Sequence, residues 1–174
     1  DIGVVGAGHV GLVTGACLAV MGNRVTCMDD DSGRVEQLQK SLVPFYEPGL
    51  GELVGEMAQE GRLSFTTDIE KTVSESKVLF ICVGTPSKAE GEADLSFVEK
   101  ACARISEAMR DYRLVVEKST VPVRTGMWIR RTMEAANTRG VPFDIACNPE
   151  FLREGSAVRD FMHPDRVVIG VESK

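Results

Sequence analysis

A short glycine pattern near the start of the chain constrains its fold more than any other feature. Residues 6–11 read Gly-Ala-Gly-His-Val-Gly, after the β-branched run IGVV and before a helical apolar pattern. A G-x-G-x-x-G pattern between a strand and a helix is typical of dinucleotide-binding βαβ units, where glycines allow a tight turn and a close approach of pyrophosphate. Free N–H groups at the helix start then attract phosphate. We therefore expect the cofactor to contact Gly6, Gly8, His9, Val10 and Gly11.

The rest of the chain repeats the alternation of strand and helix. Short β-branched runs predict strands at 2–6, 24–29, 63–67, 77–83, 114–118, 143–147 and 167–171. Helical patterns fall between them near 10–21, 33–40, 48–60, 68–75, 95–110 and 124–138. Gly22-Asn23 predicts the end of the first helix, and Thr67 to Glu70 fit a capping box for the fourth. The alternation predicts an α/β fold: a single Rossmann-like domain with a doubly wound, mainly parallel sheet.

An acidic cluster follows the second predicted strand. Residues 28–31 read Met-Asp-Asp-Asp, and Asp29 follows Gly11 at close to the roughly 20 residues expected for the acid that binds ribose hydroxyls. Its charge would repel a 2′-phosphate, so NAD is preferred over NADP, and Arg34 is placed to reach the adenosine or phosphate side. The alternative is that Asp29 to Asp31 form a solvated turn or a helix cap.

Composition narrows the classes of partner. The chain has 174 residues, 43% of them hydrophobic, and a net charge of −6, which fits one domain with its own core. The absence of a basic stretch argues against nucleic acid, and the strand-sized apolar runs argue against a membrane span. The chain begins Asp-Ile-Gly without a methionine, so we expect a fragment of a longer protein.

The cysteines point to burial rather than to metal binding. There are five, without Cys-x-x-Cys or Cys/His spacing, so no metal site is expected. Most lie inside apolar strand or helix patterns, where a free cysteine behaves as a small hydrophobic residue. Unpaired cysteines favour a reducing, cytoplasmic location.

Several separate segments resemble one known family. In chain order they are GAGHVGL at 6–12, PFYEPGL at 44–50, FICVGTP at 80–86, EKSTVPV at 117–123, NPEFLREG at 148–155 and PDRVVIG at 164–170. Together they resemble the UDP-glucose/GDP-mannose dehydrogenase family. The resemblance implies that residues 1–174 are its N-terminal NAD-binding domain, with a central helix and a C-terminal UDP-sugar-binding domain outside this chain.

By matching position, the resemblance assigns cofactor contacts. Asp29 and Arg34 would bind the adenosine half of NAD. Thr85, Pro86 and Thr120 would line the cofactor at the carboxyl ends of the fourth and fifth strands, where open α/β sheets place ligands.

The same resemblance assigns the substrate side to the segment that follows the sixth strand. The nucleotide sugar would be contacted by Glu150, Phe151, Leu152, Arg153 and Glu154. Thr120 would help hold a water, Glu150 would act as a base, and Glu154 would also lie close to the nicotinamide. The alternative is that Glu150 and Glu154 are surface acids on a turn, loosely paired with Arg153 or Arg159.

Two positions depart from the family's usual pattern. His9 stands where these enzymes commonly carry Tyr, and from the sequence we expect a loop residue there rather than a catalyst. Arg124 follows STVPV where Gly is common, so the loop after Thr120 is expected to be stiffer or differently placed. Neither departure removes an assigned role.

A larger departure is the absence of a nucleophile. The family oxidises a sugar alcohol to a carboxylate in two NAD-dependent hydride transfers, and a cysteine in a downstream Gly-rich motif captures the aldehyde, assisted by a lysine. None of the five cysteines here has that context, including Cys147, the nearest in sequence to the site. We therefore expect this chain alone to be inactive.

The sequence leaves several functions open. The leading hypothesis is the NAD-binding half of an enzyme that converts UDP-glucose to UDP-glucuronate and works as a homodimer or higher homo-oligomer. Alternatives are a GDP-mannose or UDP-N-acetylhexosamine dehydrogenase, or a non-catalytic NAD-binding module. A hydroxy-acid dehydrogenase would not explain PDRVVIG or residues 148–155.

Overall fold

A seven-stranded sheet forms the centre of the molecule. The structure is a computed structural model that describes residues 1–89, 91–121 and 125–171. Its strands are β1 (Ile2–Val5), β2 (Val25–Met28), β3 (Leu63–Thr66), β4 (Val78–Ile81), β5 (Arg113–Glu117), β6 (Phe143–Cys147) and β7 (Gly170–Val171). Their order across the described sheet is β3-β2-β1-β4-β5-β6-β7; all pairs are parallel except β6 with β7. The predicted Rossmann-like fold, with its switch point between β1 and β4, is confirmed.

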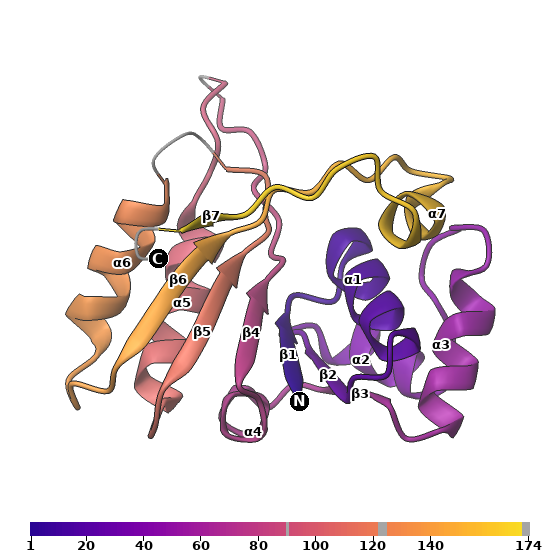
Figure 1. The fold of residues 1–174 in the computed structure, drawn as a ribbon, viewed down its shortest axis with the longest axis horizontal. Coiled ribbons are helices and arrows are strands. Elements are labelled where there is room, and N and C mark those ends of the chain that lie inside the picture. Colours follow the sequence, from indigo (N-terminus) through magenta and orange to yellow (C-terminus); the bar gives the residue numbers. More distant parts are fainter. Residues whose placement is uncertain (90, 122–124, 172–174) are drawn as a thin grey trace.

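Helices cover both faces of the sheet (Figure 1). They are α1 (His9–Val20), α2 (Ser32–Gln39), α3 (Leu50–Gln59), α4 (Ile69–Glu75), α5 (Ser96–Ala108), α6 (Thr125–Ala136) and α7 (Ala157–Met162). One apolar cluster packs α1, α2, α3 and α7 against the sheet, and a second packs α4, α5 and α6 against the other face. Within the described ranges, no helix combines the length and the apolar character needed to cross a membrane.

The ends of the first and fourth helices show how local chemistry sets boundaries. Gly22 has φ +97°, and the amides of Gly22 and Asn23 donate to the carbonyls of Ala19 and Leu18, which confirms the predicted stop. For α4 the predicted Thr67 cap is wrong by one residue. Asp68 is the N-cap, and its carboxylate accepts from the amide of Lys71 at 3.0 Å.

Three other elements differ from the predicted ranges. The predicted helix at 48–60 begins only at Leu50, after Pro48 and Gly49. The predicted strand at 167–171 is reduced to Gly170–Val171, and α7 was not predicted. The predicted start of the sixth helix at Arg124 lies outside the described residues.

The chain crosses the carboxyl edge of the sheet after β6 (Figure 1). It runs from the α6 side to the α1 side, forms α7 there, and returns to β7. The outward and returning parts are joined where Asn148 Nδ2 donates to the carbonyl oxygen of Val168 at 2.9 Å. We call residues 148–169 the crossing segment. It carries the NPEFLREG sequence across the strand ends.

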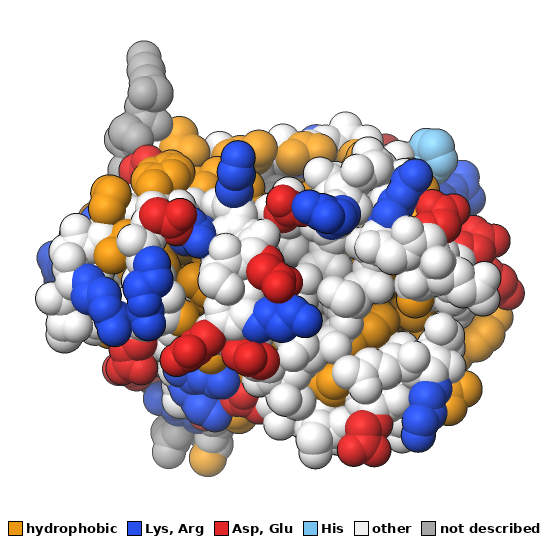
Figure 2. Space-filling model, turned by 90° about the horizontal axis from the view of Figure 1, so that it is seen from below, with side chains coloured by type: hydrophobic (Ala, Val, Ile, Leu, Met, Phe, Trp, Pro, Cys, Tyr) orange, Lys and Arg blue, Asp and Glu red, His pale blue; other side chains and the backbone are white. Residues whose placement is uncertain are grey.

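The opposite edge of the molecule has a different character. Figure 2 views the molecule from below, at the end from which the strands start, and acidic and basic side chains are interspersed over this face. Such mixing gives no extended field of one sign for a charged polymer to follow.

Candidate functional site

The phosphate turn connects β1 to α1 with very little space. A Cβ at Gly11 would lie 1.8 Å from the carbonyl oxygen of Gly6, so only glycine fits where the helix crosses the turn. A Cβ at Gly8 would meet nothing within 4 Å, so the backbone there faces open space. Gly8 is the N-cap of α1 and provides no side-chain cap, and the first turn of α1, which begins at His9 and Val10, contains no acidic residue. The predicted cofactor residues of this turn therefore form an anion-compatible helix start.

Asp29 lies directly beside this turn. It is 9% exposed, and its Oδ2 accepts from the amide of Ala7 at 2.7 Å and from Arg34 Nη1 at 2.9 Å. The solvated-turn alternative therefore does not describe Asp29. Asp31 has the helix-cap role instead, because its carboxylate accepts from the amide of Arg34 at the start of α2.

A cavity of about 540 Å³ opens in front of these groups. Gly6, Gly8, Asp29 and Arg34 line it together with the end of β4. The opposite wall belongs to α5 and was not predicted from the sequence; it consists of Phe97, Lys100, Ala101 and Arg104. Asp30 accepts from Lys100 Nζ at 2.8 Å and also pairs with Arg104, and these hydrogen bonds lower the pKa of Asp30.

The ends of β4 and β5 bring the two predicted threonines together. Thr85 Oγ1 donates to the carbonyl oxygen of Thr120 at 2.7 Å. Thr120 is exposed, Thr85 is half-buried, and Pro86 is exposed beside them. Thr85 and Thr120 thus meet at the carboxyl edge of the sheet, where open α/β sheets place ligands.

A second cavity, of about 410 Å³, lies beyond Thr120 on the α6 side. Thr120 and Glu150 both line it, although they lie 30 residues apart in the sequence. Glu117 and Cys147 line it too. Sequence reasoning assigned no role to Glu117, although a charged residue that ends the buried run LVVEK was a usable signal.

Two neighbouring charged residues of the EKST sequence have different surroundings. Glu117 is 2% exposed; its Oε1 accepts from the amide of Ser119 at 2.6 Å, and its Oε2 has no hydrogen-bond partner among the described residues. Burial raises the pKa of Glu117 to about 7, although the bonds to Ser119 lower it. Lys118 Nζ donates to Asn148 Oδ1 at 3.0 Å and lies 5.6 Å from the ring centre of Phe161, on the α7 side. Burial lowers the pKa of Lys118.

The predicted sugar-facing residues are spread along the crossing segment. Glu150 is half-buried, and its Oε2 accepts from the amide of Leu152 at 2.5 Å. Phe151 is 52% exposed, with Arg166 stacked over its ring, and Leu152 packs against the α1 side of the core. Glu154 is exposed and lines neither cavity among the described residues.

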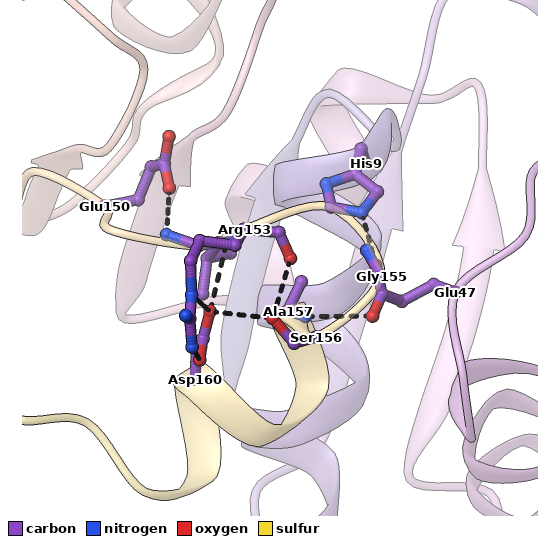
Figure 3. Close-up of polar contacts among 9 residues, drawn as sticks. His9, Glu47, Glu150, Arg153, Gly155, Ser156, Ala157 and Asp160 are labelled. Atoms are coloured by element: carbon purple, nitrogen blue, oxygen red, sulfur yellow. Dashed lines mark hydrogen bonds and ion pairs between the residues drawn. The ribbon is translucent and has the colours of Figure 1, made fainter.

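Arg153 forms an ion pair that differs from the loose pairing considered above. Its guanidinium binds both carboxylate oxygens of Asp160, at 2.7 and 3.0 Å, and its amide donates to Asp160 as well (Figure 3). This fork lowers the pKa of Asp160 to about 2. The partner of Arg153 is therefore an acid of α7, and Glu150 and Glu154 are left to other contacts.

Four of the cysteines are buried and not activated as nucleophiles. Cys17, Cys27, Cys82 and Cys102 are free thiols, and all four are buried. Burial raises the pKa of Cys17, Cys27 and Cys102 to about 12 and raises that of Cys82 as well. A thiol with such a pKa is protonated at neutral pH and is a poor nucleophile.

His9 is the first residue of α1 rather than a loop residue. Its Nε2 donates to Oε2 of Glu47 at 2.9 Å, and its ring centre lies 5.1 Å from that of Phe45, with the two rings tilted by 54°. Glu47 was not predicted as a site residue, although it is the one charged residue of the PFYEPGL sequence. The departure at Arg124 lies outside the described residues.

Comparison with known proteins identifies the family. The family model for the NAD binding domain of the UDP-glucose/GDP-mannose dehydrogenase family matches residues 1–174. The chain belongs to this family. UDP-glucose 6-dehydrogenase TuaD from Bacillus subtilis is 45% identical over 172 residues, which make up 99% of this chain and 37% of that protein.

Two solved structures of the family are also similar. The UDP-glucose dehydrogenase from the archaeon Pyrobaculum islandicum has a TM-score of 0.95 and 42% identity, over 99% of this chain and 40% of that one. A ternary complex of GDP-mannose dehydrogenase from Pseudomonas aeruginosa has a TM-score of 0.93 and 40% identity, over 98% and 40%. This dehydrogenase-family domain thus spans well under half the length of these relatives.

The residues present fit NAD as the cofactor. The uncapped start of α1 suits a pyrophosphate, the open space at Gly8 allows its close approach, and Asp29 stands at the end of β2 where a ribose would lie. NAD is the cofactor of this domain, as predicted.

Proposed function

We propose that this chain is the NAD-binding part of a cytoplasmic dehydrogenase that oxidises UDP-glucose to UDP-glucuronate. The observation that supports it best is the shared cavity of Thr120 and Glu150, next to the strand ends that face the cofactor. Family membership supplies the reaction class, and the four buried free cysteines suit a reducing compartment.

The chemistry divides into hydride removal and addition of water. Converting a primary alcohol to a carboxylate removes two hydrides, incorporates the oxygen of one water and releases protons, and NAD supplies the hydride acceptor. In our proposal the Thr120 hydroxyl holds the water and the Glu150 carboxylate takes its proton. Glu154 lies near the nicotinamide, and residues 151–153 contact the sugar side, largely through the backbone.

The choice of sugar is the part of the proposal that needs a direct test. The relatives named for UDP-glucose and for GDP-mannose are nearly equally similar to this chain, at 42% and 40% identity. We expect the full-length parent to form two NADH per UDP-glucose consumed, and to turn over GDP-mannose and UDP-N-acetylhexosamines far more slowly. Faster turnover of either alternative sugar would reassign the substrate. If no nucleotide sugar is turned over, the remaining hypothesis is a non-catalytic NAD-binding module.

We also propose that residues 1–174 bind NAD but turn nothing over alone. Covalent catalysis needs a nucleophile within hydrogen-bond reach of its partners, and four of the cysteines here are buried, with raised pKa values. The remaining parts, a central helix and a UDP-sugar-binding domain, would lie in the rest of the parent, a homodimer or higher oligomer. Sustained NADH production by the purified chain would contradict this, whereas activity restored by adding the remaining part would support it.

A further inference from the structure

A buried carboxylate connects two parts of the site that are far apart in sequence. Glu47 lies in the loop between α2 and α3, and its side chain is 0% exposed. Its Oε2 accepts from His9 Nε2 and from the amide of Gly155, both at 2.9 Å, and its Oε1 accepts from the amide of Ala157 at 2.8 Å (Figure 3). One side chain therefore holds three donors.

The three donors belong to two different functional parts. His9 begins α1 and forms part of the phosphate turn, whereas Gly155 and Ala157 lie where the crossing segment enters α7. A buried carboxylate is costly unless donors satisfy it, so all three groups are held in place together. Burial raises the pKa of Glu47, but the hydrogen bonds from His9, Gly155 and Ala157 outweigh it, so the pKa is lowered. The group is therefore an anion at neutral pH.

The other contacts that join the crossing segment to the α1 side do not have this directional effect. Leu152, Val158 and Phe161 pack on the α1 side, but apolar contact is non-directional. The Arg153–Asp160 fork joins the segment only to itself, and Arg153 is 76% exposed. Glu47 is the group that gives the segment a fixed position relative to α1.

We propose that Glu47 is a positioning residue for the sugar-facing part of the crossing segment, and that its bond to His9 couples this part to the phosphate turn. The inference rests on the proposed function for the identity of the substrate, but its geometric part is independent of that function. The NAD site at the turn and the nucleotide-sugar site at residues 150–154 are then connected by one carboxylate. This connection makes the two binding events interdependent.

The geometric part is tested by hydrogen exchange in the full-length parent. Glu47→Gln keeps one oxygen acceptor but turns an NH₂ group toward a backbone donor, so the amides of Gly155 and Ala157 should exchange ~10-fold faster or more. Glu47→Asp keeps the charge and should restore part of the protection. Glu56→Gln, an exposed change on α3, is the matched control and should leave these amides unchanged. Unchanged protection in Glu47→Gln would overturn the proposal.

The functional part is tested by separating the kinetic constants. Glu47→Gln should raise the KM for the nucleotide sugar about 10-fold, while the Kd for NAD changes less than about 3-fold. A purely structural role would lower the melting temperature without this split. If wild-type parent oxidises no nucleotide sugar, the proposed function fails, and the exchange experiment still decides whether Glu47 positions the segment.

A variant of His9 isolates the coupling. His9→Phe keeps an aromatic ring against Phe45 but removes the donor to Glu47, while the amides of Gly155 and Ala157 remain protected. The ratio of nucleotide-sugar Kd values without and with NAD should move toward one in His9→Phe and in Glu47→Gln, but not in Glu56→Gln. A ratio unchanged from wild type in both variants would refute the coupling.

Discussion

The two halves of the site are built differently. On the cofactor side, the turn after β1, the end of β2 and the wall of α5 enclose a cavity, and Asp29 at its edge is only 9% exposed. On the sugar side, Phe151 is 52% exposed, and the returning part of the crossing segment leaves Val167 and Ile169 65% and 64% exposed. Residues of this chain enclose the cofactor side, whereas the apolar side chains of the sugar side are held in place but remain exposed.

The difference follows from what holds each half. The cofactor side lies at the ends of regular elements, which parallel strand pairing and helix packing hold in place. The crossing segment is joined to the sheet near its start, where the Asn148 amide donates to the carbonyl oxygen of Glu117, and it leads into the short strand β7. Side chains such as Glu47 and Arg153 hold the part between them. Substitutions on the cofactor side should therefore affect folding and binding, and those on the sugar side should affect chemistry.

The largest effect is expected at the phosphate turn. Gly11→Ala places a Cβ 1.8 Å from a backbone oxygen that cannot move away, so we expect loss of the folded domain, measured by circular dichroism and thermal melting. Gly8→Ala is the matched control. It has free space, so it should fold normally yet bind NAD at least ~10-fold more weakly, because the new methyl group stands where a pyrophosphate approaches. A folded Gly11→Ala domain with normal NAD affinity would contradict this account.

The sugar side should show the opposite pattern in the full-length parent. Glu150→Gln and Glu154→Gln should each lower turnover by ~10²-fold or more, the usual scale for loss of a positioned acid or base. The melting temperature and NAD affinity should change far less, although some loss of NAD affinity is expected for Glu154. Near-normal turnover in both variants would return the pair to solvated surface acids.

Glu117, which ends β5, predicts how the stability of the fold depends on pH. Its native pKa of about 7 is above the ordinary value of 4.5, so the folded state binds more protons than the unfolded state between these values. The stability of the wild type should therefore fall as pH rises from about 4.5 to about 7 and then level off. At about 1.4 kcal/mol per pKa unit, this cost is roughly 3 kcal/mol.

Glu117→Gln removes that cost. The free energy of unfolding of this variant, measured by urea titration, should rise relative to that of the wild type as the pH increases from about 4.5 to about 7. The exposed variant Glu134→Gln on α6 should track the wild type at every pH. Parallel pH profiles for Glu117→Gln and wild type would show that Glu117 is ionised without penalty.

The smallest effects concern the choice between NAD and NADP. NAD should bind more tightly, and Asp29→Ala should narrow the ratio of the two Kd values by ~10-fold, because it removes the repulsion and frees Arg34. Asp30→Asn should narrow it only a few-fold, because it releases Lys100 and Arg104 from an exposed pairing. Calorimetric titration measures both, and equal or tighter binding of NADP by wild type would overturn the assignment.

The sequence predicted the parts of the fold that depend on local pattern. The first six strand runs, the glycine turn and the stop at Gly22 are local signals, and the structure confirms them. The helix α7 could not be predicted this way, because its six residues are held by Glu47, whose bond to Ala157 spans 110 positions. The strand at 167–171 was overpredicted, because only Gly170 and Val171 find a partner on β6.

The same division applies to the site. Asp29, Thr85 and Thr120 follow strands, so their places at the carboxyl edge could be predicted from the strand order. The cavity wall formed by α5 and the hydrogen bonds of Glu47 depend on tertiary contacts. Such contacts cannot be predicted from residue spacing or residue type. Arg153 illustrates the limit, because its partner is Asp160 of the unpredicted α7 rather than either glutamate beside it.

The neighbouring pair Glu117 and Lys118 has a consequence for how the gene can change. Successive residues of an extended chain face opposite sides, so Glu117 at the end of β5 faces the α6 cavity and Lys118, the next residue, faces α7. A single-residue insertion or deletion in β5 would turn both side chains to the opposite faces and place each charge on the side that the other now occupies. Length variants of this strand should therefore be eliminated during evolution even when every apolar residue is retained, whereas loops at the strand starts can vary in length.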